Sequence, residues 1–271
     1  MNDSALIEGA DREYTVQRWQ DGHLAAVVDR VAEETPVALI YNGLAHVVMM
    51  ASPIELEDFA LGFSLSEGIV ERVEEVHAIE TDAVSDGIAV YVDIERSRYL
   101  PLETQRRNLA ARTSCGLCGT ETIDQAVRHP PVVGRGVHIT AAALQRAFSD
   151  LGGRQPLNAT TGAVHAAAWA LADGRIVSVR EDVGRHNAVD KVLGLALMSG
   201  WLPLDRHVML VSGRSSFEIM QKALAARIPI VAAVSAPSSL AVEFAEASGQ
   251  SLVGFLREGR MNIYAGKSRV K

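Results

Sequence analysis

The order of apolar and polar positions in the second half of the chain predicts alternating strands and helices. Short apolar runs predict strands at 175–179, 208–211, 229–234, 252–256 and 261–264. Apolar residues at helical spacing between these runs predict helices at 187–198, 215–226 and 238–248. Apolar strands separated by helices are typical of a mostly parallel sheet with helices on both faces.

The first third of the chain has a different pattern, which predicts a smaller α+β unit. Asn42-Gly43 lies between two apolar runs, and this pair is typical of a tight β-hairpin turn. Ser52-Pro53 then begins a predicted helix that ends near Gly68. The predicted strands lie at 37–41, 46–50 and 88–94.

These patterns divide the chain into three parts. Residues 1–110 form the smaller N-terminal α+β region, and residues 136–271 form the α/β domain. Between them, 111–135 is expected to be a mobile loop followed by a short connecting helix that begins near Thr120 or Thr122.

Composition and charge narrow the class of protein. Of the 271 residues, 48% are hydrophobic and 22% charged, which is typical of a soluble globular chain. The net charge of -7 argues against general nucleic-acid binding. No apolar stretch approaches the roughly 20 residues that span a bilayer, and the acidic N-terminus does not resemble a targeting signal. We therefore expect a cytoplasmic protein that binds neither nucleic acid nor membrane.

The two cysteines, Cys115 and Cys118, are the first candidates for chemistry. Each is followed by glycine, so the backbone can approach another surface closely. Arg106, Arg107 and Arg112 precede them, and nearby positive charge favours the thiolate over the thiol. The thiolate is the form that attacks sulfur.

Other roles for this cysteine pair stay open at this point. The pair could be inert core residues, a thioredoxin-like dithiol, or half of a zinc site completed by His129 or His138. The zinc deaminase pattern is absent, because no histidine has a glutamate two positions later and Ser114 precedes Cys115.

Polar residues also follow several predicted strands, where ligands of α/β sheets bind. Arginines and helix starts at these positions are typical of phosphate or anion sites. Each motif also fits a plainer role as a capped helix start or a surface hairpin. The lone His165, in a run of small residues, indicates a buried core histidine unless the cleft is adjacent. The candidates are Arg185, His186, Ser212, Arg214 and the stretch 255–260.

Six longer motifs follow one another along the chain: ALGFSLSEGI at 60–69, CGLCG at 115–119, TGAVHAAA at 161–168, EDVGRHNAVDKVLG at 181–194, SGRSSFEIMQKA at 212–223 and IPIVAAVSAPSSLAVEFA at 228–245. Taken together, these motifs resemble the formate dehydrogenase accessory sulfurtransferase family, FdhD, from about Pro36 to Tyr264. Ala163 stands where a second glycine is frequent in that family.

The resemblance implies a fold and a function. The fold is a cytidine-deaminase-like three-layer larger domain with a smaller α+β domain, assembled as a homodimer without a structural metal. The function is a sulfur carrier that passes sulfur from a cysteine desulfurase to the molybdenum cofactor, bis-molybdopterin guanine dinucleotide, as formate dehydrogenase requires. Two rivals remain, a cofactor-binding chaperone that moves no sulfur and a dithiol oxidoreductase.

The resemblance also implies roles for particular residues. Cys115 matches the persulfide-bearing cysteine, and Cys118 matches a second cysteine whose role is less settled. The cofactor-contacting stretch corresponds to Phe255, Leu256, Arg257, Glu258, Gly259 and Arg260. To these we add Arg185, His186, Ser212 and Arg214, as our own choice for neutralising or orienting the cofactor's phosphates.

Overall fold

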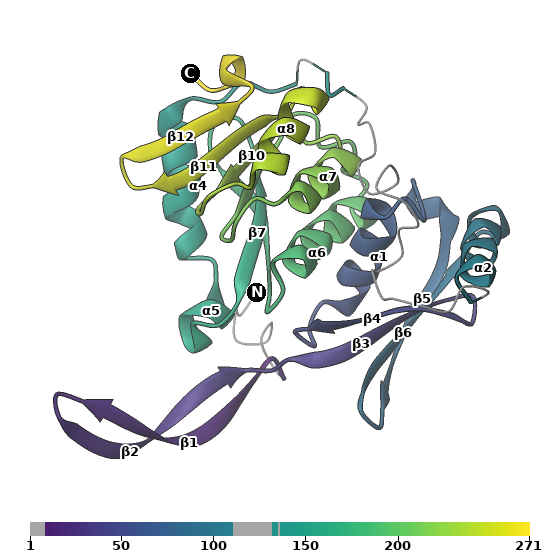
Figure 1. Ribbon diagram of the computed structural model, residues 1–271, viewed down its shortest axis with the longest axis horizontal. Coiled ribbons are helices and arrows are strands. Elements are labelled where there is room, and N and C mark those ends of the chain that lie inside the picture. Colours follow the sequence, from purple (N-terminus) through teal and green to yellow (C-terminus); the bar gives the residue numbers. More distant parts are fainter. Residues whose placement is uncertain (1–8, 111–131, 135) are drawn as a thin grey trace.

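The structure is a computed structural model that describes residues 9–110, 132–134 and 136–271. The chain forms a larger lobe, a smaller lobe and a projecting two-stranded ribbon (Figure 1). The helix predicted near Thr120 lies outside the described residues. Within the described part, no helix is both long and apolar enough to cross a membrane.

The larger lobe contains a six-stranded sheet in the order β12-β11-β10-β9-β7-β8. The strands are β7 (His165–Ala170), β8 (Ile176–Asp182), β9 (Val208–Val211), β10 (Ile230–Ala233), β11 (Ser251–Arg257) and β12 (Arg260–Ala265). Only the β9–β10 and β10–β11 pairings are parallel, whereas β7–β8, β7–β9 and β11–β12 are antiparallel. The expectation of a mostly parallel sheet was therefore wrong. The unpredicted strand β7 lies antiparallel between β8 and β9.

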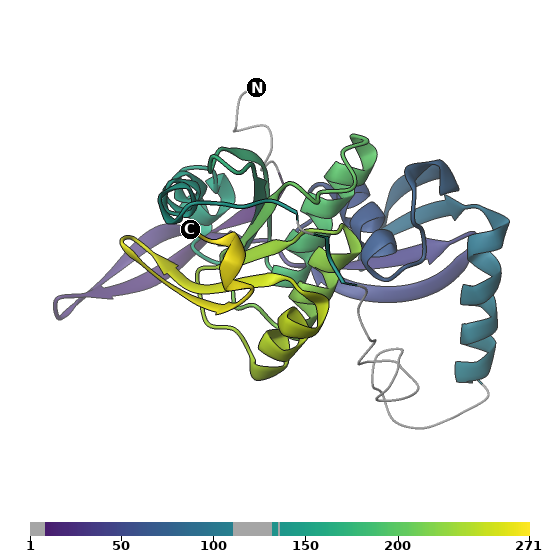
Figure 2. The same cartoon turned by 90° about the horizontal axis from the view of Figure 1, so that it is seen from above.

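Helices cover both faces of this sheet, so the lobe has three layers (Figure 2). One face packs on α4 (Ala141–Gly152), and the other packs on α6 (Arg185–Met198), α7 (Phe217–Ala225) and α8 (Ser239–Ser248). Successive residues of a strand point to opposite faces of the sheet. In β7, Ala166 and Ala168 lie in the hydrophobic core under α4, which we call the α4 core, while Ala167 and Trp169 lie in the core under α6, α7 and α8. Two short helices, α5 (Pro156–Thr161) and η3 (Lys267–Arg269), complete the lobe.

The smaller lobe is a four-stranded sheet in the order β4-β3-β6-β5 with α1 (Leu56–Ser66) packed on one face. Its strands are β3 (Thr35–Tyr41), β4 (Leu44–Ala51), β5 (Val76–Val84) and β6 (Gly87–Ile94), with η2 (Val73–Glu75) before β5 and α2 (Arg96–Ala110) after β6. Val37, Leu39 and Tyr41 of β3 are fully buried, because alternate residues of the strand face α1.

The two lobes share one hydrophobic core at a close crossing of α1 and α6. A Cβ at Gly62 would overlap the backbone carbonyl of Asp190, and a Cβ at Gly194 would overlap that of Asp58. Because no side chain separates the backbones here, the lobes are fixed against each other by direct helix packing.

The ribbon consists of β1 (Asp11–Gln20) and β2 (His23–Ala32), which pair antiparallel along their whole length. It projects away from both lobes in Figure 1. Its base is held by the Glu33 amide, which donates to the Ala10 carbonyl at 2.7 Å, and by packing of Ala32 near Leu157 of α5. The sequence pattern did not predict this element.

Candidate functional site

Polar segments that follow four strands meet at one edge of the larger sheet. β9, β10 and β11 are parallel, and β8 has the same direction because both it and β9 are antiparallel to β7. The helices α6, α7 and α8 begin at this edge, directly after β8, β9 and β10. We call it the polar edge, formed by residues 183–186, 212–216, 235–239 and 257–260.

Arg185 and His165 meet over Gly213 at the polar edge. Ser212 joins β9 to β7, since its amide donates to the Ala166 carbonyl at 2.9 Å and its Oγ accepts from the Ala166 amide at 2.8 Å. A Cβ at Gly213 would lie 3.3 Å from Cδ of Arg185 and 3.4 Å from Nδ1 of His165. The missing side chain thus leaves room for a close approach between these two. His165, assigned to the core from sequence, is half-buried beside the cationic side chain.

Two buried polar atoms at this edge have no hydrogen-bond partner among the described residues. They are Nε of Arg185 and Oγ of Ser215, a residue that is fully buried. Buried donors without partners are rare in folded proteins. A ligand with anionic oxygens would satisfy Arg185, and the neighbouring Arg214 is exposed to solvent.

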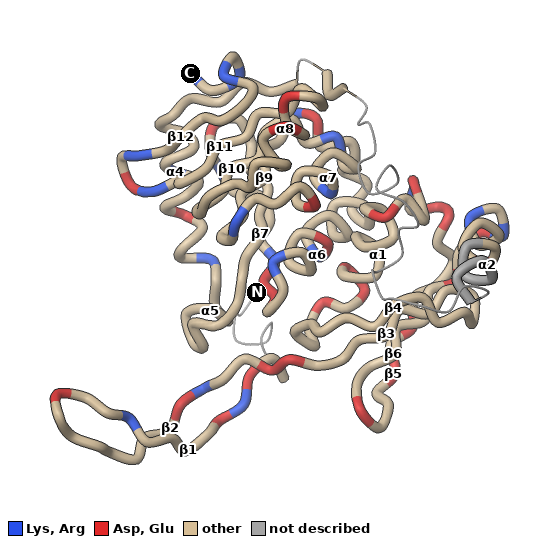
Figure 3. Tube along the Cα trace, in the orientation of Figure 1, with Lys and Arg blue, Asp and Glu red and all other residues tan. Residues whose placement is uncertain are grey.

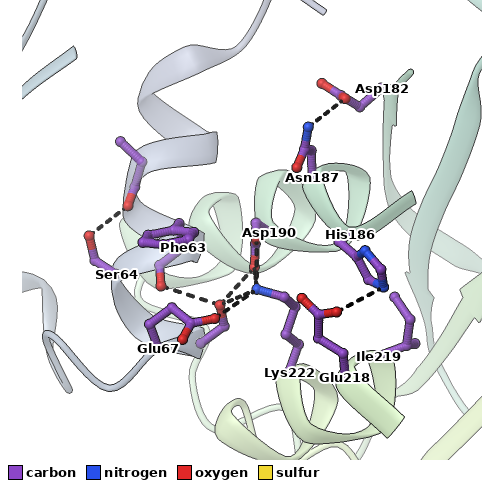
Figure 4. Close-up of polar contacts among 12 residues, drawn as sticks. Phe63, Ser64, Glu67, Asp182, His186, Asn187, Asp190, Glu218, Ile219 and Lys222 are labelled. Carbon is purple, nitrogen blue, oxygen red and sulfur yellow. Dashed lines mark hydrogen bonds and ion pairs between the residues drawn. The ribbon is translucent and has the colours of Figure 1, made fainter. Parts of the chain in front are cut away.

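His186 lies at the start of α6, beside the start of α7. Its Nε2 is 3.2 Å from Oγ of Ser216 and 3.3 Å from Oε2 of Glu218 (Figure 4). Burial, followed by the positive charge of Arg185, lowers the pKa of His186 to about 4. Burial and Arg185 also lower the pKa of His165. Both imidazoles are therefore neutral near pH 7 and able to accept or donate one hydrogen bond without adding charge.

Asp182 fixes the loop that carries Arg185 and His186. Its Oδ1 accepts from the Gly184 amide at 2.8 Å and from Nδ2 of Asn187 at 2.9 Å. Its Oδ2 accepts from the Ser52 amide at 3.0 Å and lies 2.8 Å from Nζ of Lys191. Both members of this ion pair are fully buried. The carboxylate thereby ties the polar edge to the smaller lobe.

A second buried ion pair joins α6, α7 and α1 (Figure 4). Nζ of Lys222 lies 3.0 Å from Oδ2 of Asp190 and donates to Oγ of Ser66 at 2.9 Å, while Ser66 Oγ donates to Oδ1 of Asp190 at 2.8 Å. Burial raises the pKa of Asp190 to about 6, against the attraction of Lys222. These motif residues have their hydrogen-bonding partners within the protein, so their role is structural.

The 255–260 stretch lies at the other end of the polar edge. It forms the turn between β11 and β12, with Gly259 at φ 68° and its amide donating to Oε1 of Gln145 at 3.1 Å. Arg257, Glu258 and Arg260 are exposed, whereas the Leu256 side chain is fully buried in the α4 core and is not available to a ligand. Figure 3 shows these basic positions apart from those at the start of α6. Four strand spacings separate β8 from β11, or roughly 19 Å.

The structure thus brings Arg185, His186 and Ser212 together with Arg214, and leaves 257–260 at a distance along the same edge. Phe255, in β11, is half-buried and has φ 51°. Its amide donates to the carbonyl of Ser235, in the segment that follows β10, at 3.1 Å.

Cys115 and Cys118 lie outside the described residues. The described chain stops at Ala110, the end of α2, and resumes at Val132. The Val133 amide donates to the Ser248 carbonyl at 2.9 Å, at the end of α8 and beside the start of β11. The chain therefore re-enters the larger lobe at the edge of the sheet opposite the polar edge.

Two surface cavities lie away from the polar edge. One of about 540 Å³ is bordered by Val137, Asp173 and Arg206, and one of about 470 Å³ by Leu65, Leu197 and other residues near the ends of α1, α6 and α7. Neither is lined by a residue of the polar edge, whose polar and basic side chains make it the better candidate for an anionic ligand.

The fold and the order of the motifs define one family of proteins, and the comparison with known sequences identifies it. Residues 32–271 match the sequence model of the FdhD/NarQ family, so the chain belongs to this family, as the resemblance predicted.

Individual relatives agree with this assignment. The chain is 48% identical over 258 residues to a sulfur carrier protein FdhD of Cupriavidus necator, which covers 95% of this chain and 89% of the relative. It is 46% identical over 256 residues to one of Xanthomonas euvesicatoria, covering 94% and 91%. A crystal structure of a candidate formate dehydrogenase accessory protein from Desulfotalea psychrophila superposes with a TM-score of 0.75 at 24% identity, covering 97% and 100%. That likeness supports the fold.

Proposed function

We propose that this protein is a sulfur carrier that takes sulfur from a cysteine desulfurase and passes it to bis-molybdopterin guanine dinucleotide, the molybdenum cofactor used by formate dehydrogenase. Two observations together support the proposal. The chain contains a Cys-x-x-Cys pair, and relatives that are 46–48% identical to it are named sulfur carrier proteins. The cofactor is the substrate here and not a resident group.

The chemistry assigned to the cysteines consists of two exchanges. The Cys115 thiolate attacks the outer sulfur of the desulfurase persulfide, forming a new S–S bond as the desulfurase thiolate leaves. Cys115 then carries a persulfide. The Cys118 thiolate attacks the inner sulfur of that persulfide, so a Cys115–Cys118 disulfide forms and hydrosulfide leaves toward the cofactor. The sulfane sulfur is reduced as the two cysteines are oxidised.

The polar edge is proposed to hold the cofactor by its phosphates. Nε of Arg185 is buried without a partner among the described residues, and Arg214 is exposed beside it, so both side chains are suited to bind phosphate oxygens. Ser212 and His186 provide neutral hydrogen-bonding groups, and Arg257 and Arg260 bind farther along. A ligand with phosphates well separated from one another suits this spread of charge.

The first experiment measures the intact mass of the protein after incubation with a cysteine desulfurase and cysteine. A gain of about 32 Da, one sulfur atom, that is removed by reductant is expected for the wild type and lost in Cys115→Ala. Cys118→Ala serves as the matched control, because it retains the acceptor cysteine and should still gain sulfur. A gain that persists in Cys115→Ala contradicts the proposed role of that residue.

A second candidate function is a cofactor-binding chaperone that moves no sulfur. The buried donors of Arg185 and Ser215, which have no partner within the described ranges, favour ligand binding whether or not the cysteines react. Sulfur loading separates the two functions. If no variant gains mass while the protein still binds guanosine diphosphate by calorimetry, the chaperone replaces the carrier.

Further expectations from the sequence patterns and from the resemblance are proposed with this function. They are a cytidine-deaminase-like topology of the larger lobe, the division at 1–110, 111–135 and 136–271, a cytoplasmic location, a complex with formate dehydrogenase, and assembly as a homodimer.

A further inference from the structure

On the side of the smaller sheet away from α1, paired residues of β3 and β4 are apolar where solvent-facing strands are normally polar, whereas the edge strand β5 carries Glu80 and Asp82 on that side. Strand register places Met50 beside Pro36, Val48 beside Ala38, and Ile40 beside Tyr91, all on the side away from α1. Val48, Met50 and Tyr91 are 65%, 46% and 37% exposed. We call this surface the open face; it comprises Pro36, Ala38, Ile40, Val48, Met50 and Tyr91. Contiguous exposed apolar surface of this kind marks an interaction site.

The ribbon carries a second apolar surface at its distal end. Trp19 pairs with Leu24, and Thr15 with Val28, so the four side chains share one face of the ribbon. Trp19, Leu24 and Val28 are 69%, 68% and 64% exposed. Gln17 and Ala26 lie between these pairs on the same face, so its distal half carries no charge. We call this surface the ribbon face.

The charged residues of the ribbon are largely paired with each other. Arg30 donates to Asp11 at 2.7 Å, Arg12 donates to Glu33 at 3.0 Å, and Arg18 lies 3.6 Å from Asp29. Two of these pairs stabilise the base of the ribbon, and the Arg18–Asp29 pair lies on the side opposite the ribbon face. An isolated two-stranded ribbon is only marginally stable in water. Its distal half therefore gains most from packing against an apolar surface.

The ribbon cannot reach the open face of its own chain. β2 continues into β3 through Glu33 and Glu34, and Figure 1 shows the ribbon extending away from the sheet that β3 begins. Folding it back would break the packing of Ala10 and Ala32 near Leu157 of the larger lobe. The ribbon face is thus directed toward another molecule.

We propose that the ribbon face of one copy packs on the open face of a second copy, and that a two-fold axis makes the exchange reciprocal. This inference rests on the homodimer named with the proposed function and assigns its contact surfaces. A reciprocal exchange covers both apolar surfaces of both copies, which is the closed arrangement that two-fold symmetry gives. A different protein seated on one surface would leave the other exposed.

Sedimentation equilibrium of the full chain over a concentration series tests the exchange. The wild type is expected to be a dimer. Trp19→Glu and Val48→Glu each place a carboxylate in both contacts of a homodimer, so each should raise the dissociation constant on the order of 100-fold. Met198→Glu is the matched control, because Met198 is 45% exposed at the end of α6 in the larger lobe and outside both surfaces. Met50→Glu replaces Val48→Glu if circular dichroism shows that the latter is unfolded.

Mixing the two variants distinguishes reciprocal exchange from other dimers. A heterodimer of Trp19→Glu with Val48→Glu has one contact carrying both carboxylates and one contact that is unchanged. Equimolar mixing should therefore restore dimers that neither variant forms alone.

Three results would overturn the proposal. They are a monomeric wild type, a variant that dimerises normally, as Val48→Glu would in a ribbon-to-ribbon dimer, and a mixture that stays monomeric. Sulfur loading by intact mass depends on Cys115, so it reports failure of the carrier function separately from failure of the dimer.

Discussion

Two regions of the molecule use residues of the same sequence motifs in opposite ways. One region is the contact between the two lobes, and the other is the polar edge. At the lobe contact, Asp182 and Lys191 are fully buried and paired, as are Asp190 and Lys222 apart from 3% exposure of the lysine side chain. At the polar edge, only a few residues away, Arg185 and Ser215 each have a buried polar atom without a partner in the described part of the chain. Charges satisfied within the protein hold it together, whereas unsatisfied ones are available to a ligand.

The largest effect is expected when a satisfied pair is broken. Lys222→Met leaves Asp190 buried without its cation and should lower the free energy of unfolding by about 3–5 kcal/mol. Urea denaturation measures the loss. The same change at the exposed Lys267 is the control and should have little effect. The double variant Asp190→Asn/Lys222→Met removes both charges and should recover part of the loss, and a double variant as unstable as the single one would contradict this account.

Glu55 is an exception within the lobe contact. It lies 3.2 Å from Arg180, but its Oε2 is buried without a partner among the described residues, and Asp58 also binds that arginine at 2.7 Å. Burial raises the pKa of Glu55 to about 7, against the attraction of Arg180. The raised pKa of Glu55 therefore predicts that the stability of the lobe contact depends on pH.

Between pH 4.5 and 7 the Glu55 carboxyl is protonated in a larger fraction of folded molecules than of unfolded ones. The contribution of this group to the free energy of unfolding therefore falls as pH rises. Glu55→Gln removes that titration. The difference in unfolding free energy between variant and wild type should shift in favour of the variant by about 1–3 kcal/mol from pH 5 to pH 8. Urea denaturation at both values measures it. Subtracting the two proteins cancels the opposite contribution of His186, whose lowered pKa makes stability rise with pH. A constant difference would show that Glu55 titrates normally.

Sequence patterns predicted the elements that carry strong local signals. The strand at 208–211 is observed with the same bounds, and Ser216 and Ser238 cap their helices by accepting from the amides of Ile219 and Ala241. β7 was missed because His165–Ala170 is mostly alanine, which has no strand preference. The ribbon was missed because its apolar residues face solvent and follow no burial pattern.

The candidate site was predictable only in part. Arginines after strands indicated the polar edge, but the roles of Asp182 and Asp190 depend on Ser52 and Ser66, which are 130 and 124 residues away in the sequence. His165 could be placed beside Arg185 only once β7 was paired with β9, because the contact over Gly213 follows from that pairing.

The smallest effect on stability is expected at the polar edge. This prediction tests most directly whether the polar edge binds a ligand while the lobe contact stabilises the fold. Arg185→Gln removes a side chain whose Nε bonds to nothing in the described protein, so the unfolding free energy should change by less than about 0.5 kcal/mol. Affinity for guanosine diphosphate, measured by calorimetry, should nevertheless fall on the order of 10-fold, because a charge-assisted hydrogen bond to phosphate is lost.

Arg206→Gln is the matched control for this prediction, since Arg206 is exposed and borders the cavity away from the polar edge. It should change neither quantity. If Arg185→Gln instead destabilised the fold by several kcal/mol while leaving affinity unchanged, Arg185 would belong with the paired charges of the lobe contact. The unpartnered Nε of Arg185 would then be comparable to Nε1 of Trp169, a donor in the hydrophobic core that also has no partner among the described residues.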